Sequence, residues 1–368
     1  MNALHGARLV TSAGVLDDAW LELSADRIAA LGTGPVPAAA HDLGGGYLVP
    51  GFIDVHVHGG GGNDFTASAA ELAAGIAFHR RHGTTRNLVS LMAGSLDALC
   101  EQLGWLVALS DDRVAGAHLE GPFLSRRRCG AQNSHHLQLP DRQVLAKLLE
   151  AGQGLVRTMT IAPELPGALE VIDDLVAAGG IAAIGHTDAS YEQALAGFAA
   201  GARLTTHLYN AMPTIRHRAP GAAVAALESA EFVELINDGV HVHPAMLRLV
   251  DPARIVLVTD AMSATGVGDG SYVLGGLPVT VAGGQARSTE TGALAGSTLT
   301  MDVAFRRAVT EVGLSLPDAV RVSSTNPARL LGIQDRCGDI RPGLAADLVH
   351  LADDLTLRRV MVAGRWLS

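Results

Sequence analysis

Eight short apolar runs, most of them followed by a helix-like pattern, constrain the fold of this sequence more than any other feature. Near-continuous apolar strands that alternate with helices are typical of a parallel sheet buried on both faces. Eight such strand–helix units predict a (β/α)8 TIM-like barrel. We expect strands at residues 52–58, 86–91, 114–119, 156–161, 181–184, 203–206, 232–236 and 254–259, and helices at 69–82, 141–150, 167–178, 191–200 and 298–312.

The chain is longer than such a barrel requires. Its 368 residues exceed the roughly 250 of an ordinary barrel, so a second unit must account for the remainder. Short strand-like segments separated by turns occupy both ends of the chain. Because the two ends of a domain often lie close together, we expect them to pair into one small β-sandwich domain. The predicted organisation is 1–50 and 336–368 for that domain and 51–335 for the barrel, with a hairpin at 270–295.

Composition and charge exclude several classes of protein. The formal net charge of −10 argues against a nucleic-acid partner. No run approaches the roughly 18 apolar residues of a membrane span, and the first residues lack the basic and apolar regions of a signal peptide. Cys100, Cys129 and Cys337 are few, odd in number and widely spaced, which indicates reduced thiols. We therefore expect a cytoplasmic protein without a membrane partner.

Two histidines, His56 and His58, end the first apolar run and are followed by four glycines. Side chains two residues apart on a strand point to the same face, so these imidazoles would project together, with Asp54 one step behind. Paired imidazoles suit a borderline-soft divalent metal. The alternative is a strand end that merely carries two histidines, because this short pattern is a weak signal by itself.

Further residues of metal-ligating type recur where other expected strands end. Glu120, His186, His207 and Asp260 each follow such a strand, and active sites of this barrel class lie at the carboxyl ends of the strands. Singly, Glu120 could be a turn carboxylate, His186 or Asp260 a helix cap, and His207 a hydrogen-bonded core residue. Six such residues at the ends of five strands favour a metal-dependent active site.

Four of the histidines outside this set have expected places of their own. His118 lies one strand step before Glu120 on the same face, and we expect it to support a ligand rather than bind metal. His79, His82 and His217 are expected on a helix surface or in a loop.

Seven motifs, in order and spacing, resemble the N-acetylglucosamine-6-phosphate deacetylase family of the amidohydrolase superfamily. They are PGFIDVHVHGGGG, HLEGPF, GHTDAS, THLYNAM, DGVHVHP, LVTDAM and LAGSTLTM. THLYNAM together with HLEGPF is specific to the family, whereas the HxH pair and the terminal Asp belong to the whole superfamily. With the flanking β segments, the resemblance covers nearly the whole chain.

The resemblance implies a reaction and a set of roles. Glu120, His186 and His207 would hold one divalent metal, and His56 and His58 a second one bridged through Glu120. The expected cofactor is therefore one or two divalent metals per subunit, with zinc first and iron, manganese or cobalt also compatible with these donors. Metal polarises the amide carbonyl and lowers the pKa of water. Asp260 would be the general base, and His241 would stabilise the oxyanion.

The implied activity is hydrolysis of the N-acetyl group of N-acetylglucosamine 6-phosphate to glucosamine 6-phosphate and acetate, in amino-sugar catabolism or cell-wall recycling. The resemblance places the substrate phosphate near Asn210, Ala211 and Arg218, with Arg216 as a competitor. Residues 124–136 are expected to form a mobile lid. There the chain has Gln132 where the family often has histidine, which leaves the choice of hexosamine open; Gln132 could still contact a hydroxyl or the acetyl group.

Three alternatives remain at this point. Another amidohydrolase, such as an N-acyl-D-amino-acid deacylase or a dihydroorotase-like cyclic amidase, would share the metal set but not the THLYNAM segment. An N-acetylgalactosamine-6-phosphate deacetylase is the second alternative. A non-catalytic barrel would have no reason to keep the full set of ligands together with Asp260. The family resemblance also implies a homodimer.

Overall fold

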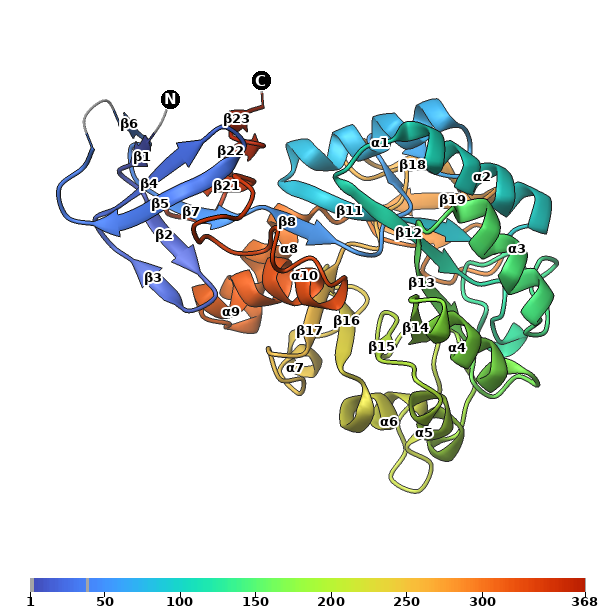
Figure 1. Cartoon of the computed structure of the whole chain (residues 1–368). Coiled ribbons are helices and arrows are strands. Elements are labelled where there is room, and N and C mark those ends of the chain that lie inside the picture. Colours follow the sequence, from blue (N-terminus) through green and yellow to red (C-terminus); the bar gives the residue numbers. More distant parts are fainter. Residues whose placement is uncertain (1–2, 38–39, 368) are drawn as a thin grey trace.

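One eight-stranded parallel sheet forms the centre of the computed structural model, which describes residues 3–37 and 40–367 (Figure 1). Each strand pairs with the next in chain order, and all of these ladders are parallel. The TIM-like barrel and its eight predicted strands are thereby confirmed. The strands are β8(Phe52–Asp54), β11(Thr84–Met92), β12(Val114–Glu120), β13(Val156–Ile161), β14(Ile181–Ile184), β15(Leu204–Thr205), β16(Phe232–Ile236) and β17(Ile255–Val258).

The seam between the first and last strands departs from the prediction. The expected first strand, 52–58, ends at Asp54 in β8. His56 and His58 follow it in a segment that crosses to the end of β17, where the Asp260 N–H donates to the His56 carbonyl and the His58 N–H to the Ala261 carbonyl, each at 2.8 Å. Val57 and Ala261 form an isolated parallel bridge. The barrel therefore closes at its carboxyl end through the histidine segment itself.

Helices cover the outside of the barrel (Figure 1). Side-chain oxygens of Ser68, Asp141 and Ser190 accept backbone N–H bonds at the starts of three of them, which fixes where these helices begin. The predicted helices are α1(Ala69–Arg81), α3(Arg142–Gly152), α4(Ala168–Ala177), α5(Tyr191–Ala199) and α8(Met301–Arg307), which continues as the π-helical segment η2(Ala308–Val312).

Several helical segments were not predicted. In α2(Leu96–Leu109) the buried residues Leu99, Leu103 and Leu106 repeat at helical spacing, so the signal was present in the sequence. The others are short: α6(Gly221–Ser229), α7(Pro244–Leu247), α9(Leu316–Val320), η3(Arg321–Thr325) and α10(Asn326–Leu330). Segments of four or five residues carry too few turns for periodicity to identify them. Helix α6 is as long as the predicted α5, but its alanine-rich sequence shows little contrast between its faces.

Both chain ends contribute to one small β unit beside the barrel (Figure 1). Strand β21(Leu348–Leu351) pairs antiparallel with β7(Tyr47–Pro50), with Val349 opposite Val49. A six-stranded sheet runs β23(Arg365–Trp366), β22(Leu357–Val362), β21, β7, β2(Arg8–Thr11) and β3(Gly14–Leu16). A four-stranded sheet runs β5(Arg27–Thr33), β4(Ala19–Ser24), β1(Ala3–His5) and β6(His41–Asp42).

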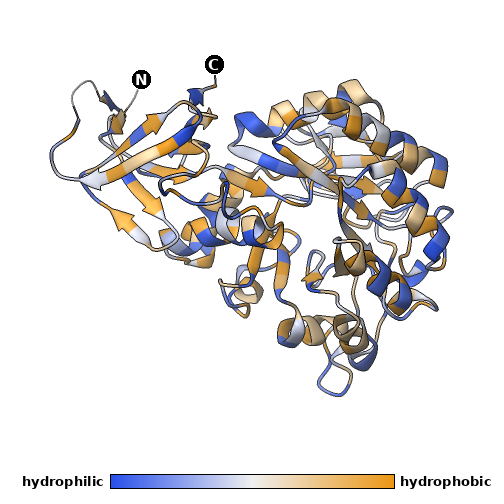
Figure 2. Ribbon diagram, in the orientation of Figure 1, coloured by the Kyte–Doolittle hydropathy of each residue, from blue (hydrophilic) through white to orange (hydrophobic). Residues whose placement is uncertain are grey.

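Apolar side chains from both sheets make the core of this unit. Leu4, Leu21 and Leu48 are buried together with Leu348 and Met361 from the far end of the chain. Figure 2 shows hydrophobic residues along the strands of this unit and of the barrel. The pairing of the two chain ends follows the prediction. The exact domain limits, 1–50, 51–335 and 336–368, stay a prediction, and their outermost residues 1–2 and 368 lie outside the described part of the chain.

The segment predicted as a hairpin at 270–295 contains three strands instead of two. β18(Gly270–Leu274), β19(Leu277–Ala282) and β20(Gln285–Ser288) form an antiparallel sheet. Its inner side chains Leu274, Val279, Val281 and Ala286 pack with Met92 and Met262 near the end of the barrel. A second small ladder joins β9(Gly59–Gly60) to β10(Asn63–Asp64). Across the described ranges, no helix is long and apolar enough to cross a membrane.

Candidate active site

Glu120, at the last position of β12, is the centre of a first group of ligand-type side chains. Its Oε1 lies 2.9 Å from His186 Nε2 and 3.1 Å from His207 Nε2, and the two imidazole nitrogens are 3.0 Å apart. All three residues are buried. We call Glu120, His186 and His207 the Glu120 group. The three predicted first-metal ligands are thus brought together, although they come from three different strand ends.

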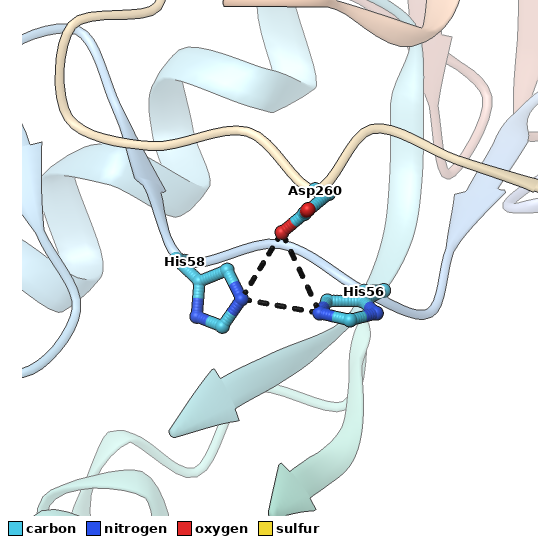
Figure 3. Close-up of side chains that lie close together, drawn as sticks. All are labelled: His56, His58 and Asp260. Atoms are coloured by element: carbon cyan, nitrogen blue, oxygen red, sulfur yellow. Dashed lines mark hydrogen bonds and ion pairs between the residues drawn. The ribbon is translucent and has the colours of Figure 1, made fainter. Parts of the chain in front are cut away.

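His56, His58 and Asp260 form a second group, the His56 group (Figure 3). The Nε2 atoms of the two histidines are 3.1 Å apart, and Asp260 Oδ1 lies 3.2 Å from His58 Nε2 and 3.5 Å from His56 Nε2. The sequence analysis expected Asp260 to be a base but did not place it beside these histidines, and the structure shows that its carboxylate completes the trio.

Glu120 also connects the two groups. Its Oε1 lies 3.4 Å from His56 Nε2 and its Oε2 lies 3.3 Å from His58 Nε2. The predicted bridging position of Glu120 between two metal positions therefore agrees with the geometry.

The donor set fits divalent metal ions. His186 Nδ1 faces the Arg128 carbonyl at 2.9 Å, and His56 Nδ1 faces Glu234 Oε2 at 2.9 Å, so in the neutral rings each Nδ1 must donate. Each Nε2 then presents a lone pair toward a carboxylate oxygen and another imidazole nitrogen. Convergent lone pairs in a buried site repel one another unless a cation lies among them, and imidazole with carboxylate is a set that zinc, iron, manganese and cobalt accept.

The raised pKa values of His56 and His58 also indicate that this site needs positive charge. Burial disfavours the charged form of His58, but hydrogen bonds to Asp260 and Glu120 outweigh burial and raise its pKa to about 9. Burial likewise opposes the charged form of His56, while Glu120, Glu234 and Asp260 raise its pKa well above the usual value. The carboxylates around these rings therefore require positive charge, which either protons or metal ions can supply.

Positive backbone angles aim the ligands into the barrel mouth. His186, His207 and Asp260 have φ values of 45°, 27° and 50°, and Tyr209 and Ala211 follow with 79° and 51°. Such angles are strained for residues other than glycine and cluster at functional sites. His186, His207 and Asp260 each lie two residues after the end of a barrel strand, where the chain turns. No local pattern in the sequence indicated these angles.

The two groups lie at the floor of a cavity of about 290 Å³. Of the residues predicted to bind substrate, Gln132, Asn210, Ala211 and His241 line this cavity. Further lining residues include Met92, Tyr209, Leu274, Ala293 and Leu294, which the sequence analysis did not name.

Arg218 is placed differently. It is exposed on the loop before α6 and is not among the residues that line the cavity, and its competitor Arg216 is exposed on the same loop. The phosphate-binding role of Arg218 stays a prediction.

His241 forms a buried pair with Asp238. Its Nδ1 lies 2.7 Å from Asp238 Oδ2, while Asp238 Oδ1 accepts the N–H groups of Val240 and His241. Burial opposes the charge on His241, but Asp238 and Asp260 outweigh it and raise the pKa of His241, with Arg287 acting in the opposite direction. The ring nitrogen that does not contact Asp238 remains for the cavity.

Gln132 binds the protein at both ends of its amide. Nε2 donates to Glu120 Oε2 at 2.5 Å, and Oε1 accepts the N–H of Ala93 at 2.9 Å. The surrounding segment, predicted as a mobile lid, includes the short 3-10 turn η1(Arg126–Arg128), and Arg128 Nε contacts Asp188 at 2.9 Å. This segment therefore contacts the Glu120 group directly, while its mobility stays a prediction.

The supporting histidines differ from one another. His118 behaves as predicted: Nδ1 lies 3.0 Å from Ser90 Oγ, Nε2 lies 2.8 Å from Thr160 Oγ1, and its ring lies edge-on to that of His56. His79 was predicted on a helix surface, and this is wrong, because it is buried with Nε2 2.8 Å from the Gly59 carbonyl. The packing of α1 against β9 explains its burial.

His82 and His217 lie in the kind of position that was predicted for them, at a helix end and in a loop. His82, at the end of α1, is partly exposed and lies 3.3 Å from Asp302. His217 is exposed on the loop before α6.

One buried carboxylate of the site was missed altogether: Glu234, which contacts His56. Asp54 was placed one step behind the two histidines but was given no role, and it accepts the Thr259 hydroxyl at 2.5 Å. The signal for Glu234 was available, since it is a charged residue inside an otherwise apolar predicted strand.

The sequence model of the amidohydrolase family matches residues 47–367, and the chain belongs to that family. Within it, the chain is 35% identical to the N-acetylgalactosamine-6-phosphate deacetylase of Escherichia coli O157:H7, over 100% of this chain and 99% of that protein. It is 38% identical to the N-acetylglucosamine-6-phosphate deacetylase of Bacillus subtilis (strain 168), over 83% of this chain and 81% of that one.

A solved structure agrees. The N-acetyl-D-glucosamine-6-phosphate deacetylase of Mycobacterium smegmatis, as an aspartate-to-alanine mutant in complex with N-acetyl-D-glucosamine-6-phosphate, superposes with a TM-score of 0.95 at 44% identity, covering 99% of this chain and 98% of that one. The resemblance stated from the seven motifs is confirmed.

Proposed function

We propose that this protein hydrolyses the N-acetyl group of N-acetylglucosamine 6-phosphate, releasing glucosamine 6-phosphate and acetate, in amino-sugar catabolism or cell-wall recycling. The observation that carries the proposal is the pair of buried ligand groups sharing Glu120 at the floor of a cavity lined by Asn210, Ala211 and His241. Its relatives at 35–44% identity, named as deacetylases of the two hexosamine 6-phosphates, support the substrate class.

The Glu120 group would hold one divalent ion and the His56 group a second. A divalent ion supplies Lewis-acid polarisation of an amide carbonyl and lowers the pKa of water. Zinc is the first expectation for its identity, with iron, manganese and cobalt as alternatives that the same donors accept.

Asp260 would move the proton. Burial would raise its pKa, but without metal the charge of His56 and the hydrogen bond from His58 lower it to about 2. A divalent ion held by the neutral rings of His56 and His58 would favour the ionised carboxylate in the same way. An ionised carboxylate at the cavity floor can accept a proton from water and then deliver it to the departing sugar nitrogen. The C–N bond breaks as acetate and the free amine form.

His241 and the wall residues would hold the substrate. Asp238 favours the charged form of His241, whose other ring nitrogen can donate a hydrogen bond to the developing oxyanion. Asn210 and Ala211 offer polar groups at the wall, and Arg218 would have to reach the phosphate from its exposed loop. Both ends of the Gln132 amide are already bonded inside the protein, so Gln132 would serve the substrate chiefly by orienting Glu120.

N-acetylgalactosamine 6-phosphate is the second candidate substrate. The observation that favours it is the Escherichia coli relative of that name, which matches this chain over its full length.

The test is acetate release by metal-replete protein from three sugars: N-acetylglucosamine 6-phosphate, N-acetylgalactosamine 6-phosphate and unphosphorylated N-acetylglucosamine. We expect fast release from the first and little from the last. Faster release from N-acetylgalactosamine 6-phosphate would make that sugar the preferred substrate. No release from any of the three sugars with metal bound would refute the phosphosugar proposal. N-acyl-D-amino acids would then be tested as substrates.

Arg218 has its own test. Replacing it with alanine should raise KM for the phosphorylated sugar by roughly 10- to 100-fold, as expected for one lost charge-assisted hydrogen-bond donor. The matched control is Arg216→Ala, two residues away on the same exposed loop, which should change KM little. The reverse ranking would reassign the phosphate to Arg216.

A homodimer and a cytoplasmic location belong to the same proposal. Light scattering on the purified protein tests the first, and fractionation of cells tests the second.

A further inference from the structure

Glu234 is a buried carboxylate to which the proposed reaction gives no part. It lies in the middle of β16, is 1% exposed, and points into the barrel mouth, where its Oε2 lies 2.9 Å from His56 Nδ1. The same oxygen accepts the backbone N–H of His207 at 3.2 Å. One carboxylate oxygen thus contacts a member of each ligand group, from the side away from the cavity.

The contact with His56 decides which ring nitrogen can bind a metal. A hydrogen bond from Nδ1–H to Glu234 leaves Nε2 unprotonated and fixes the plane of the ring. That Nε2 is the atom that faces His58, Asp260 and Glu120.

The other histidines of the two groups lack such a partner. His186 Nδ1 faces a backbone carbonyl, and the Nδ1 atoms of His58 and His207 are buried without a hydrogen-bond partner within the described residues. Glu234 is therefore the carboxylate that orients a histidine of the ligand groups.

The contact with His207 supports a strained backbone. His207 has a φ of 27°, and its peptide N–H points at Glu234. The next residue, Leu208, donates its N–H to the Glu234 backbone carbonyl at 2.9 Å. Glu234 thus holds the turn that carries His207, although the imidazole itself is oriented only by the groups on its Nε2 side.

The charge of Glu234 favours a second cation. Glu120, Asp260 and Glu234 are three carboxylates within 3.5 Å of His56 ring nitrogens, all of them buried. Buried charge is costly unless opposite charge lies close to it. A single divalent ion compensates two of the three negative charges, so the negative charge that remains attracts a second ion.

We propose that Glu234 is a positioning residue that holds His56 as a ligand and thereby sets the affinity of the His56 group for a second divalent ion. The inference rests on the metal dependence in the proposed function but not on the identity of the substrate. Partners of this kind typically change metal affinity by roughly 10- to 100-fold when they are removed.

Ion binding without substrate tests the proposal. Protein freed of metal with a chelator is titrated with Co²⁺ and followed by visible absorbance, and zinc content after dialysis is measured by mass spectrometry. We expect two equivalents for the wild type. In Glu234→Ala the backbone bond from Leu208 still holds the turn that carries His207, so the first equivalent should stay within about threefold. The second equivalent should weaken by roughly 10- to 100-fold. Glu234→Gln keeps an oxygen that can accept from His56, so its second equivalent should lie between the two.

A matched control separates this role from general destabilisation. Asp302 is another largely buried carboxylate that contacts a histidine, His82, but neither residue belongs to the ligand groups. Asp302→Asn should bind both equivalents as the wild type does. Circular dichroism confirms that each variant is folded, and Glu234→Gln carries the test if the alanine variant is not.

Three results would overturn the proposal: an unchanged second equivalent in Glu234→Ala and Glu234→Gln, equal weakening of both equivalents, or a wild type that binds a single ion. A protein that binds two ions with the expected dependence on Glu234, yet releases no acetate from any phosphosugar, would refute the proposed function and leave the role of Glu234 intact.

Discussion

The Glu120 group and the His56 group are in contact through the Glu120 carboxylate. Different parts of the molecule hold the two groups in place. The segment 124–137 holds the first: the Arg128 carbonyl accepts from His186, and Gln132 donates to Glu120. The barrel seam holds the second: the Asp260 N–H donates to the His56 carbonyl. A loop can shift without moving the barrel, so a rearrangement of that segment would reach the Glu120 group first.

Asp54 connects the first barrel strand to the residues after the last one, and we call its hydrogen bonds the clamp of the seam. Its Oδ2 accepts the Thr259 hydroxyl, and its Oδ1 accepts the N–H groups of Thr259 and His56, each at 3.3 Å. Burial raises the pKa of Asp54 to about 7, although these hydrogen bonds act in the opposite direction. The clamp ties the first barrel strand to the last just below the two histidines, which explains how short strands place them so closely.

The largest effect on turnover is expected at Asp260, the residue at the barrel seam that is proposed to transfer the proton. Asp260→Asn keeps the shape and removes the base, so turnover should fall by roughly a thousandfold, within the range of general acid–base catalysis. The ion of the Glu120 group should be retained, because none of its three ligands is changed. Steady-state kinetics together with metal analysis check this. Near-normal turnover would remove Asp260 from the proton-transfer role.

The sequence predicted the site well wherever chemistry follows a strand end. Glu120, His186 and His207 each come at or just after a recognisable apolar run, and parallel strands of a barrel end at one rim. The proximity of Asp260 to His56 was harder to predict from the sequence, because it depends on how the barrel closes. Strand β8 ends at Asp54, and the histidine segment pairs with the residues after β17.

Long-range packing set the limits of prediction. His79 follows a helical pattern that says nothing of β9 lying against it, and its burial could not be read locally. Glu234 was visible as a charge between Val233 and Leu235, but which groups it contacts depends on β15 and the seam. The positive φ values of His186 and His207 likewise arise from turns that the tertiary structure imposes.

A smaller effect is expected on the loop side. Gln132→Ala leaves Glu120 Oε2 and the Ala93 N–H without this partner, and kcat/KM should fall roughly 10-fold, as for one hydrogen bond to a charged group. Hydrogen exchange in 124–137 should rise, while exchange at the seam should not. Gln138→Ala, at an exposed glutamine just beyond the segment, is the control. Faster exchange at the seam would contradict the separate anchoring of the two groups.

The pH dependence is expected to depend on Asp238. The folded pKa of His241 is raised, so the favourable charge is fully present below about 6.5 and is lost as pH rises through the folded value. Asp238→Asn removes the main cause of the rise and leaves Asp260 and Arg287 as the nearby charges. The alkaline fall of kcat/KM should therefore move to lower pH in this variant, and pH profiles of the two proteins measure the displacement. Asp251→Asn, on an exposed turn, is the control, and an unmoved profile would remove His241 from catalysis.

The smallest effect on activity is expected from loosening the clamp itself. Thr259→Val keeps the volume but deprives the buried Asp54 Oδ2 of its hydroxyl donor, which should lower the free energy of unfolding by about 1–3 kcal/mol. Urea unfolding of metal-free protein at one pH measures this. Thr158→Val is a matched control, because that threonine is equally buried in a barrel strand and its hydroxyl has no hydrogen-bond partner in the described residues. Since Asp54 retains two backbone donors, the seam should stay closed and kcat/KM should remain within about threefold. Equal losses of stability in both valine variants would show that Thr259 contributes only its packing, and that the backbone bonds alone hold the two ends of the barrel together.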